Sequence, residues 1–556
     1  MVTLRERAPE ELLSALNPDP LVASLLFSRG ISSRNAADAF ITPSYTNDIY
    51  DPFLLPDMER AVARIEEAMA RNERIGIWSD YDCDGIPAAV ILADVFLRFG
   101  YANVEHYVPH RVREGFGLNQ TGIDELAGKK VRLLITLDCG TANVSEVAHA
   151  NQQGMEVIIT DHHLPGVVLP NAFAIINPKL PESDYPDDRL CGAGVSWKLA
   201  HALMQKRAVP EGQEKWLLDM AGLATIADMV PLLGENRAIA KYGITVLRKS
   251  RRPGLQALLR KVRVRQGMLS EEDISFSIVP RINAASRMGH ADMALQLLTS
   301  SDLAEAGALA DALEKMNNER KGVVAAMVKD AKRRLLERES IAPVIVIGNP
   351  DWKPSLLGLV AQSLTRDFAR PAFVWGREES TTIKGSVRSS GINVHELMQS
   401  ASEVFLEHGG HAFSGGFSTA PDRVHLIEPA LVSALSLVEP AAAQTLMADA
   451  QLSLSDLSSK LLSRIEMLSP YGEGNPRPQF LFEGVTVSAL RSFGKGNDHV
   501  EATFSKGTNS ATGIAFFRSP EQFLKPLVDG HRADILATIE RPAFGSGVRL
   551  RLIEAL

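Results

Sequence analysis

The sequence predicts an α/β protein of several domains: a doubly wound parallel sheet, a smaller α/β domain and a terminal β-barrel. Three observations predict this order. Continuous apolar runs alternate with helical patterns in the first third, one helical stretch at roughly 303–338 has few breakers, and the last hundred residues carry short strand-like runs between glycine-rich turns. A length of 556 residues also allows about three to four domains at roughly 150 residues each.

The first domain is predicted from four apolar runs, each long enough for one strand. The expected strands are 74–78, 104–109, 131–140 and 155–163. Helical patterns at 87–100 and 142–154 separate them. Apolar strands joined by helices indicate a parallel sheet covered on both faces, which is a doubly wound fold.

The remaining elements follow in order along the chain. Residues from about 190 to 300 are mostly helical in pattern, and Asp302 with Glu305 has the spacing of a capping box ahead of the long helix. A helix of that length is expected to connect domains. Strands at 342–350 and 369–376 open a second α/β unit, and the barrel is expected from strand-like runs at 479–490, 511–519, 532–544 and 548–556. The expected divisions are 1–300, 301–340 for the connecting helix, 341–440 and 450–556.

Composition excludes several classes of protein. With 59 basic and 67 acidic residues the net charge is −8, which argues against a protein that binds nucleic acid by bulk charge but not against a local basic groove. The three cysteines, Cys83, Cys139 and Cys191, have no CxxC spacing, so neither a disulfide framework nor a cysteine zinc site is expected. No run approaches 18 apolar residues. We therefore expect a cytoplasmic protein with no membrane contact.

Acidic residues and histidines follow the expected strands of the first domain. Asp80, Asp82 and Asp84 come after the first strand, Asp138 ends another, and the string DHH at 161–163 ends a third. The ligand crevice of a doubly wound sheet lies at the carboxyl ends of its strands, so these groups are expected to meet at one edge. Asp228, after an apolar helix, is a further candidate.

This set of side chains predicts a metal centre. A single aspartate at a strand end is more often a helix cap, but several carboxylates brought together raise one another's pKa unless cations neutralise them. Aspartate oxygens mixed with one or two histidine nitrogens suit Mn²⁺ or Mg²⁺ better than calcium or structural zinc. Two such ions about 4 Å apart can activate water for hydrolysis of a phosphate ester.

The strings DYDCDG, LDCG and ITDHH resemble the successive motifs of the DHH phosphoesterase superfamily. Further strings resemble its branch of single-strand-specific 5′-to-3′ exonucleases, in order along nearly the whole chain. They are VPHRVREGFGLN (108–119), CGAGVSWKLAHAL (191–203), IADMVPLLGENR (226–237), PRINAASRMG (280–289), KGSVRSSGINVHEL (384–397), GGHAFSGGF (409–417) and LSPYGEGNPRPQF (468–480). The resemblance implies a DHH domain, a DHH-associated domain and a C-terminal oligonucleotide-binding barrel.

The resemblance also implies roles for individual residues. The implied ligands of two divalent ions are Asp82, Asp84, Asp138, His162 and Asp228, with Asp80 as a neighbour or additional ligand. His163 would contact the scissile phosphate. His411 would reach the substrate phosphate from the second domain, with Gly409 and Gly410 allowing close backbone approach. The arginines that match DNA-binding or 5′-phosphate-binding positions are Arg111, Arg281, Arg287 and Arg388, of which Arg281 and Arg388 are favoured.

Several positions depart from the superfamily pattern, including Pro87 in the run IPAAV, where relatives usually have serine or threonine. Trp78 and Lys353 stand where relatives often have histidine, and Ser286 stands where a glycine is common. None of these positions is one of the core carboxylates. They concern the contacts with substrate and not the reaction.

The function expected from this resemblance is metal-dependent removal of nucleotides from the 5′ end of single-stranded DNA, in DNA repair and recombination. A single-strand-binding protein and a RecQ-type helicase are the implied partners, and we expect a monomer. Alternatives are a phosphodiesterase for short oligonucleotides or cyclic dinucleotides, a pyrophosphate or polyphosphate hydrolase, and a catalytically silent DNA-binding scaffold. The extra C-terminal barrel counts against the two other hydrolases, and an intact ligand set counts against the scaffold.

Overall fold

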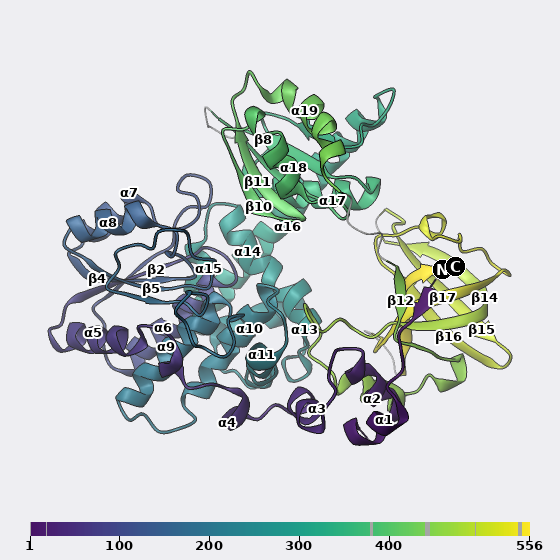
Figure 1. Cartoon of the computed structure of the whole chain (residues 1–556), viewed down its shortest axis with the longest axis horizontal. Helices are drawn as coiled ribbons and strands as arrows, with labels where there is room; N and C mark the ends of the chain where they lie inside the picture. Colours follow the sequence, from purple (N-terminus) through teal and green to yellow (C-terminus); the bar gives the residue numbers. More distant parts are fainter. Residues whose placement is uncertain (1, 18, 378–381, 440–444, 495, 543–546) are drawn as a thin grey trace.

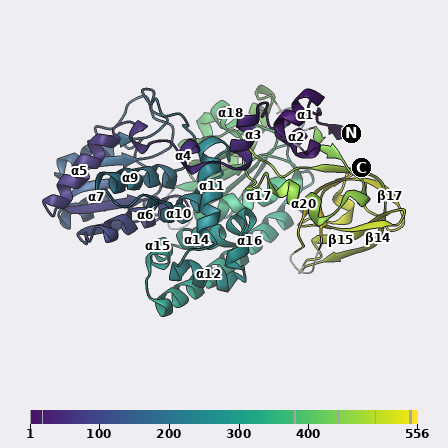
Figure 2. The ribbon, with the colours of Figure 1, turned by 90° about the horizontal axis from the view of Figure 1, so that it is seen from below.

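The computed structural model describes residues 2–556 except 18, 378–381, 440–444, 495 and 543–546. Two α/β domains and a β-barrel are arranged around the long helix α16 (Figure 1). Seen at right angles, the parallel-sheet domain and the barrel lie at opposite ends of the molecule (Figure 2). The predicted fold class is confirmed.

The first domain is built on a five-stranded parallel sheet. Its order is β3 (Val104–Tyr107), β2 (Arg74–Ser79), β4 (Val131–Leu137), β5 (Glu156–Thr160) and β6 (Ala174–Ile176). Helices α5 (Met58–Ala70), α6 (Gly85–Arg98) and α9 (Gly192–Lys206) pack on one face, and α7 (Gln120–Gly128) with α8 (Val144–Gln152) covers the other. The sequence predicted the four longer strands. It did not predict β6, whose three residues are too short to form a pattern.

The strand order places the topological switch point between β2 and β4. From β2 the chain runs outward to β3, then returns across β2 to β4 and continues to β6 on the other side. The connections that leave β2 and β4 therefore diverge, and a crevice opens at their carboxyl ends. Asp80 follows β2 and Asp138 follows β4, so the predicted acidic residues border this crevice.

A helical layer completes the first domain. It consists of α10 (Leu218–Ala227), α11 (Gly234–Leu247), α12 (Pro253–Val262), α14 (Val279–Arg287) and α15 (Asp292–Thr299). Helices α10 and α11 cross very closely at Gly222 and Gly243, where a β-carbon on Gly222 would lie 2.6 Å from the Gly243 Cα. Because α10 ends at Ala227, this packing fixes the position at which Asp228 leaves the helix.

Helix α16 (Leu303–Leu336) is longer than any other described helix, and it belongs to two hydrophobic cores. Ala306, Ala310 and Leu313 are buried in the first domain, whereas Met327, Ala331 and Leu335 are buried in the second. The sequence predicted the helix as a connector, and the structure shows that it is also a core element at both ends. The carboxylate of Asp302 caps it by accepting hydrogen bonds from the backbone N–H groups of Ala304 and Glu305.

The second domain has a five-stranded mixed sheet. Its order is β10 (Glu407–His411), β11 (Ser414–Thr419), β9 (Ile383–Arg388), β8 (Ala372–Gly376) and β7 (Ile345–Gly348), and only β7 and β8 are parallel neighbours. Helix α17 (Leu357–Phe368) and the second half of α16 cover one face, and α18 (Val394–Ser400) with α19 (Ile427–Ala434) covers the other. The β10–β11 hairpin lies on the side that faces α14 and α16 (Figure 1).

The C-terminal strands form a closed five-stranded barrel. They are β14 (Phe480–Phe493), β15 (His499–Lys506), β16 (Asn509–Ala515), β18 (Arg549–Ala555) and β17 (Arg532–Glu540), and pairing of β14 with β17 closes the ring. The sequence did not predict β15, and residues 543–544 of one expected strand lie outside the described residues. A short parallel strand, β13 (Ala450–Gln451), pairs with β14.

The N-terminal segment packs on the barrel rather than on the first sheet. Helices α1 (Glu10–Leu16), α2 (Pro20–Phe27) and α3 (Arg34–Ile41) share one hydrophobic cluster with barrel residues and with α20 (Ser459–Glu466). Strand β1 (Val2–Leu4) pairs with β12 (Leu446–Ala448). The chain therefore passes from the barrel side to the first domain before it returns at its C-terminal end (Figure 2).

None of the helices in the described residues combines the length and the apolar character that crossing a membrane requires.

Candidate metal centre and substrate cavity

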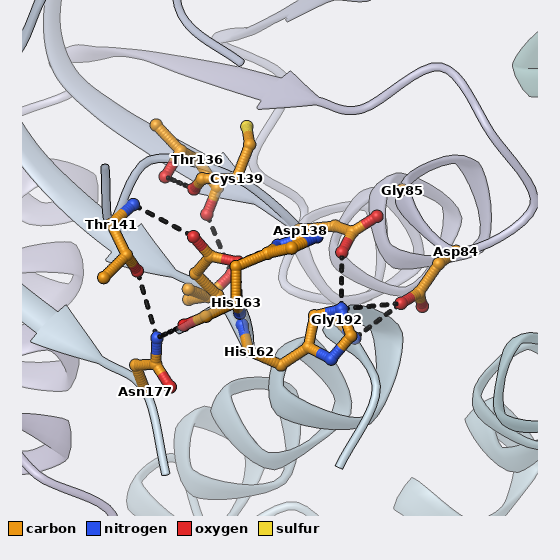
Figure 3. A network of polar contacts seen from close by, with 12 residues as sticks. Asp84, Gly85, Thr136, Asp138, Cys139, Thr141, His162, His163, Asn177 and Gly192 are labelled. Carbon is orange, nitrogen blue, oxygen red and sulfur yellow. Dashed lines mark hydrogen bonds and ion pairs between the residues drawn. The ribbon is translucent and has the colours of Figure 1, made fainter. Parts of the chain in front are cut away.

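The structure gathers the predicted acidic residues and His162 at the switch point. The Nε2 atom of His162 lies 3.2 Å from Asp138 Oδ1, 3.7 Å from Asp84 Oδ2 and 3.8 Å from Asp228 Oδ2. Ligand atoms of Asp80, Asp82 and Asp138 lie within 4.8 Å of one another. Asp138 thus lies close both to His162 and to the pair Asp80 and Asp82. Figure 3 shows His162 between Asp138 and Asp84.

Each strand end orients its carboxylate by a local device. Asp82 accepts hydrogen bonds at Oδ1 from the N–H groups of Asp84 and Gly85, at 2.8 and 3.3 Å, so it closes the turn after β2. Asp138 has a φ of 62°, a left-handed conformation that aspartate tolerates better than most residues. These backbone features aim the side chains into the crevice.

Asp84 is held by the N-terminus of α9. Its two carboxylate oxygens accept hydrogen bonds from the N–H groups of Gly192 and Ala193 at 2.6 and 2.7 Å. This use of the string CGAG was not predicted. The glycines that follow Cys191 were the signal for it, because a helix N-terminus with little side-chain bulk favours the close approach of an anion.

Electrostatics show that this cluster fits divalent cations. Burial, followed by repulsion from neighbouring carboxylates, raises the pKa of Asp84 to about 6 and that of Asp228 to about 9. The same two causes raise the pKa of Asp80 and Asp138 well above the usual range. Oδ1 of Asp80 and Oδ1 of Asp138 are buried without a hydrogen-bond donor. Cations would satisfy these oxygens and remove the repulsion.

The two histidines of the DHH string have opposite properties. Burial, together with the charge of His163, lowers the pKa of His162 to about 3, which keeps its ring neutral and able to bind a metal. Burial alone would lower the pKa of His163, but the hydrogen bond from its Nδ1 to Asp161, at 2.7 Å, helps to raise it. His163 is therefore suited to contact a phosphate as a cation.

Asp161 orients His163, and the sequence analysis assigned it no role. Its carboxylate accepts hydrogen bonds from the N–H groups of Thr141, His162 and His163 as well as from the His163 ring. Although burial opposes it, these bonds lower the pKa of Asp161. Its place inside the DHH string was the available signal.

Trp78 lies on the face of the sheet that α7 and α8 cover, whereas the candidate metal ligands follow the carboxyl ends of the strands. Its ring is fully buried among residues of α7 and β4 and stacks on Tyr107, with a centroid distance of 4.3 Å. The tryptophan that stands where relatives often have histidine therefore fills part of a hydrophobic core. Ser286 is also buried, in α14, and its hydroxyl donates to the Asn283 carbonyl at 3.3 Å.

Two cavities lie between the first and second domains. One, of about 430 Å³, is lined by Tyr81 and Arg111 from the first domain and by Ser355, Lys384 and Gly409 among others from the second. The other, of about 680 Å³, is lined by basic residues of both domains: His110, Arg113, Arg287, His290, Lys353 and Lys384. A strand passing between the domains would meet positive charge on both sides.

Three of the four predicted arginines gather beside these cavities. Burial, followed by the charges of Arg111, Arg320 and Arg388, lowers the pKa of Arg287 to about 9. Arg111 lies over the Tyr81 ring, with Cζ 4.8 Å from the ring centroid. Guanidinium groups whose charges act on one another in this way favour an anion such as phosphate. Arg320, on α16, was not predicted as a member of this cluster.

Arg281 has a different environment from the other predicted arginines. Its Nε and Nη2 atoms donate to Glu314 at 2.7 and 3.3 Å, and its Nη1 donates to the Ser277 carbonyl. Its guanidinium joins α14 to α16, so the preference for Arg281 among the predicted binding residues finds no support in these contacts.

The predicted glycine-glycine-histidine residues lie on the β10–β11 hairpin. Gly409 lines the smaller cavity, and Gly410 and His411 are exposed at the end of β10. Gly410 has a φ of 139°, and a β-carbon there would lie 2.4 Å from the Ser414 carbonyl oxygen. Among the described residues, no contact joins His411 to the metal-centre carboxylates.

Family models match all three parts of the chain. They are the N-terminal domain of the DHH family at residues 74–227, the DHHA1 domain at 340–435 and the RecJ OB domain at 448–553. The first two ranges contain the parallel sheet and the mixed sheet, and the third covers the barrel except for the last two residues of β18.

Curated relatives match the chain over most of its length. RecJ from Bacillus subtilis, named a single-stranded-DNA-specific exonuclease, is 34% identical over 95% of this chain and 66% of its own length. The Thermus thermophilus protein of the same name is 33% identical over 86% of this chain and 68% of its own length, and the Escherichia coli one is 29% identical over 87% of this chain and 86% of its own length. The chain thus spans about two thirds of the first two relatives.

Solved structures of RecJ are also similar to this chain. RecJ from Thermus thermophilus in complex with Mn²⁺ is 27% identical, has a TM-score of 0.83, and is covered over 79% of its length by the whole of this chain. A structure of exonuclease RecJ bound to manganese is 33% identical with a TM-score of 0.60, over 69% of this chain and 95% of that one. The chain therefore belongs to the RecJ family of the DHH phosphoesterases.

Proposed function

We propose that this protein is a metal-dependent exonuclease that hydrolyses single-stranded DNA from its 5′ end to 5′-mononucleotides. The observation that carries the proposal is the position of the acidic cluster, at the switch point, beside cavities that basic residues of both domains line. Hydrolysis of a phosphodiester needs both parts, because the metal centre performs the reaction and the cations hold the chain of phosphates.

The proposed ligands of two Mn²⁺ or Mg²⁺ ions are Asp80, Asp82, Asp84, Asp138, His162 and Asp228. When bound, such ions activate water and neutralise charge on the phosphate. His162 would offer its neutral ring nitrogen, while Gly192 and Ala193 fix Asp84 in place. His163, oriented by Asp161, would hold a phosphate oxygen.

The proposed substrate site consists of Arg111, Arg287 and Arg388, the backbone at Gly409 and Gly410, and His411. A contact between Arg287 of the first domain and Ser355 of the second supports this proposal. Arg287 Nη1 donates to the Ser355 carbonyl at 2.9 Å, and Ser355 Oγ donates to the Arg287 carbonyl at 2.8 Å. This reciprocal pair of hydrogen bonds joins the two domains beside both cavities. The contact would keep the cavities too narrow for more than a single strand.

The barrel would extend the binding path, as oligonucleotide-binding folds do. A single-strand-binding protein and a RecQ-type helicase are the partners that we propose, with a role in DNA repair and recombination. We also propose that the protein is a cytoplasmic monomer, in which the catalytic unit ends near residue 300, the second domain spans 341–440 and the barrel spans 450–556.

The test is digestion of single strands labelled at the 5′ or the 3′ end, and of blunt duplex, with added Mn²⁺. We expect 5′-labelled mononucleotide to appear first from single strands, little degradation of duplex, and no activity in EDTA. Asp138→Ala is the matched control and should be inactive. Equal rates on duplex and single strands would contradict the narrow path, and equal, near-zero turnover by both proteins would favour a silent scaffold.

A further inference from the structure

The string GENR at the start of α11 is buried although three of its four residues are polar. Glu235 and Asn236 are fully buried, and Arg237 is 1% exposed. Glu235 contacts Lys198 and Tyr185 inside the first domain. Arg237 points the other way, toward the segment that leads into the barrel, and it takes no part in the metal centre or the cavities.

Arg237 binds the main chain of two distant segments. Its Nη2 donates to the carbonyls of Leu468 and Ser469 at 2.8 and 3.1 Å, its Nη1 donates to Pro470 at 3.4 Å, and its Nε donates to the Phe40 carbonyl. The Phe40 ring also lies 3.6 Å from the guanidinium carbon. One side chain of the first domain therefore fixes both the N-terminal segment and the segment before β14.

The segment 468–476, which contains the string LSPYGEGNP, is shaped to receive this guanidinium. The buried side chain of Asn475 donates through Nδ2 to the carbonyls of Leu468 and Pro470, each at 2.8 Å. Arg29 in turn donates to Asn475 Oδ1 at 2.7 Å and to the Pro476 carbonyl at 2.7 Å. These bonds hold successive carbonyls in one orientation, which a planar guanidinium can match.

A second contact joins the same segment to the first domain at Glu271 and Glu272. The carboxylate of Glu271 accepts from Ser469 Oγ at 3.2 Å and from the Tyr471 N–H at 3.3 Å. Arg477 pairs with Glu271 and Glu272 at 3.4 and 3.3 Å. Arg551 of β18 also reaches Glu272, at 3.3 Å, so the barrel itself is included.

We propose that Arg237 is a positioning residue that holds the barrel in one orientation relative to the metal centre, so that a strand lying on the barrel is aligned with the path between the two α/β domains. The contacts of Arg237, Glu271 and Glu272 with segment 468–477 form this joint. The inference rests on the proposed function, because it concerns how strands long enough to reach the barrel are used. Strands too short to reach the barrel do not depend on the joint.

The reason is geometric. Two binding surfaces on one chain strengthen each other only when their spacing and orientation allow one strand to occupy both. A barrel attached by a loosened joint still folds and still binds, but it no longer presents its strand in line with the cavities. The gain in affinity that comes from strand length is then lost.

The experiment compares a short oligonucleotide of about 4 nucleotides with one of about 30, a length that exceeds the site of one oligonucleotide-binding barrel. The ratio of the two KM values is measured for the full-length protein and for Arg237→Gln. We expect wild type to have a much lower KM for the long strand than for the short one. In Arg237→Gln the ratio of the short-strand KM to the long-strand KM should be roughly tenfold smaller. The kcat and KM of the short oligonucleotide should stay unchanged.

Arg252→Gln is the matched control. Arg252 is also a largely buried arginine, but it binds Asp219 at 2.7 Å and Asp94 within the first domain. Its loss should lower stability and leave the ratio of the two KM values unchanged. Arg237→Lys, which can still donate to some of the carbonyls, should restore part of the ratio. Arg477→Ala weakens the joint without removing a fully buried group, so it provides the same test if Arg237→Gln does not fold.

A second readout does not depend on activity. Spin labels on the outer surfaces of the first domain and the barrel should give a narrow distance distribution in wild type and a broad one in Arg237→Gln. An unchanged distribution together with an unchanged length ratio would overturn the inference. If the wild-type protein hydrolysed neither strand, the proposed function would fail instead, so the two failures are distinguishable.

Discussion

Gly192 lies against two of the proposed metal ligands, Asp84 and Asp138, at once. Its N–H donates to Asp84 Oδ2 at 2.6 Å, and a β-carbon on Gly192 would lie 2.4 Å from Asp138 Oδ1. The N-terminus of α9 thus approaches Asp138 as closely as a backbone without a side chain allows.

Gly192→Ala should therefore lower activity by about 10–100-fold while the fold persists. The added methyl group would displace Asp138 or move α9 away from Asp84, and changing a group that orients a metal-binding side chain typically costs about 10–100-fold in metal affinity or activity. Nuclease rates and Mn²⁺ binding by calorimetry check this. Gly194→Ala is the control, because its nearest neighbouring atoms would be 3.6 Å from the new β-carbon. Equal losses in both variants would contradict the steric argument.

Asp161→Asn should lower activity and shift its pH dependence. The carboxylate helps to raise the pKa of His163, so its removal should lower that pKa. Because His163 acts as a cation in the proposed site, the alkaline limb of the pH–rate profile should move to lower pH. Asp124→Asn, which changes the exposed pair with His149, is the control. An unmoved alkaline limb would exclude His163 as the group that titrates there.

Arg388→Gln and Arg281→Gln should have different effects, although the sequence analysis favoured both for binding. Arg388 belongs to the arginine cluster, and a lost charge-assisted hydrogen bond to phosphate costs about 1.5–3 kcal/mol, or roughly 10–150-fold in KM. Arg281 is paired with Glu314, so its loss should mainly lower the melting temperature. Steady-state kinetics on 5′-phosphorylated single strands, with thermal unfolding in parallel, separate the two. A larger KM effect at Arg281 would reverse the assignment.

His201→Gln should remove part of the loss of stability at acidic pH. Burial lowers the pKa of His201 from 6.5 to about 4 in the folded chain. Between those values the unfolded chain binds a proton that the folded chain does not, so stability falls as pH decreases from 6.5 toward 4. The contribution is at most about 3 kcal/mol, at about 1.4 kcal/mol per pKa unit. Denaturant unfolding at pH 7 and pH 4.5 checks it, and parallel losses in both proteins would disprove the role of His201.

The parts of the site that follow from strand ends were predictable from the sequence. Asp84, Asp138 and His162 each come directly after an apolar run or its turn, and in a parallel sheet such positions converge. The structure brings them together at the distances that a metal centre requires. The fold class was predictable for the same reason, since buried strands and long helices leave strong periodic patterns.

The parts that depend on tertiary contacts were not predictable. Periodicity does not reveal that Arg281 finds an acidic partner on α16 whereas Arg287 stays among other arginines. A three-residue strand such as β6 carries too little pattern, and β15 lies next to residues rich in glycine and polar side chains. The use of Gly192 by Asp84 involves positions that are 108 residues apart.

Both α/β domains pack on helix α16, so the number of residues between their two packing sites sets the rotation of one domain relative to the other. An α-helix turns by about 100° for each residue, at 3.6 residues per turn. Inserting a single residue between Leu313 and Met327, which are buried in the first and second domains, would turn the entire second domain about the helix axis and carry Gly409 away from Arg111. The length of this helix, counted in residues, is therefore as much a part of the substrate site as any side chain that lines it.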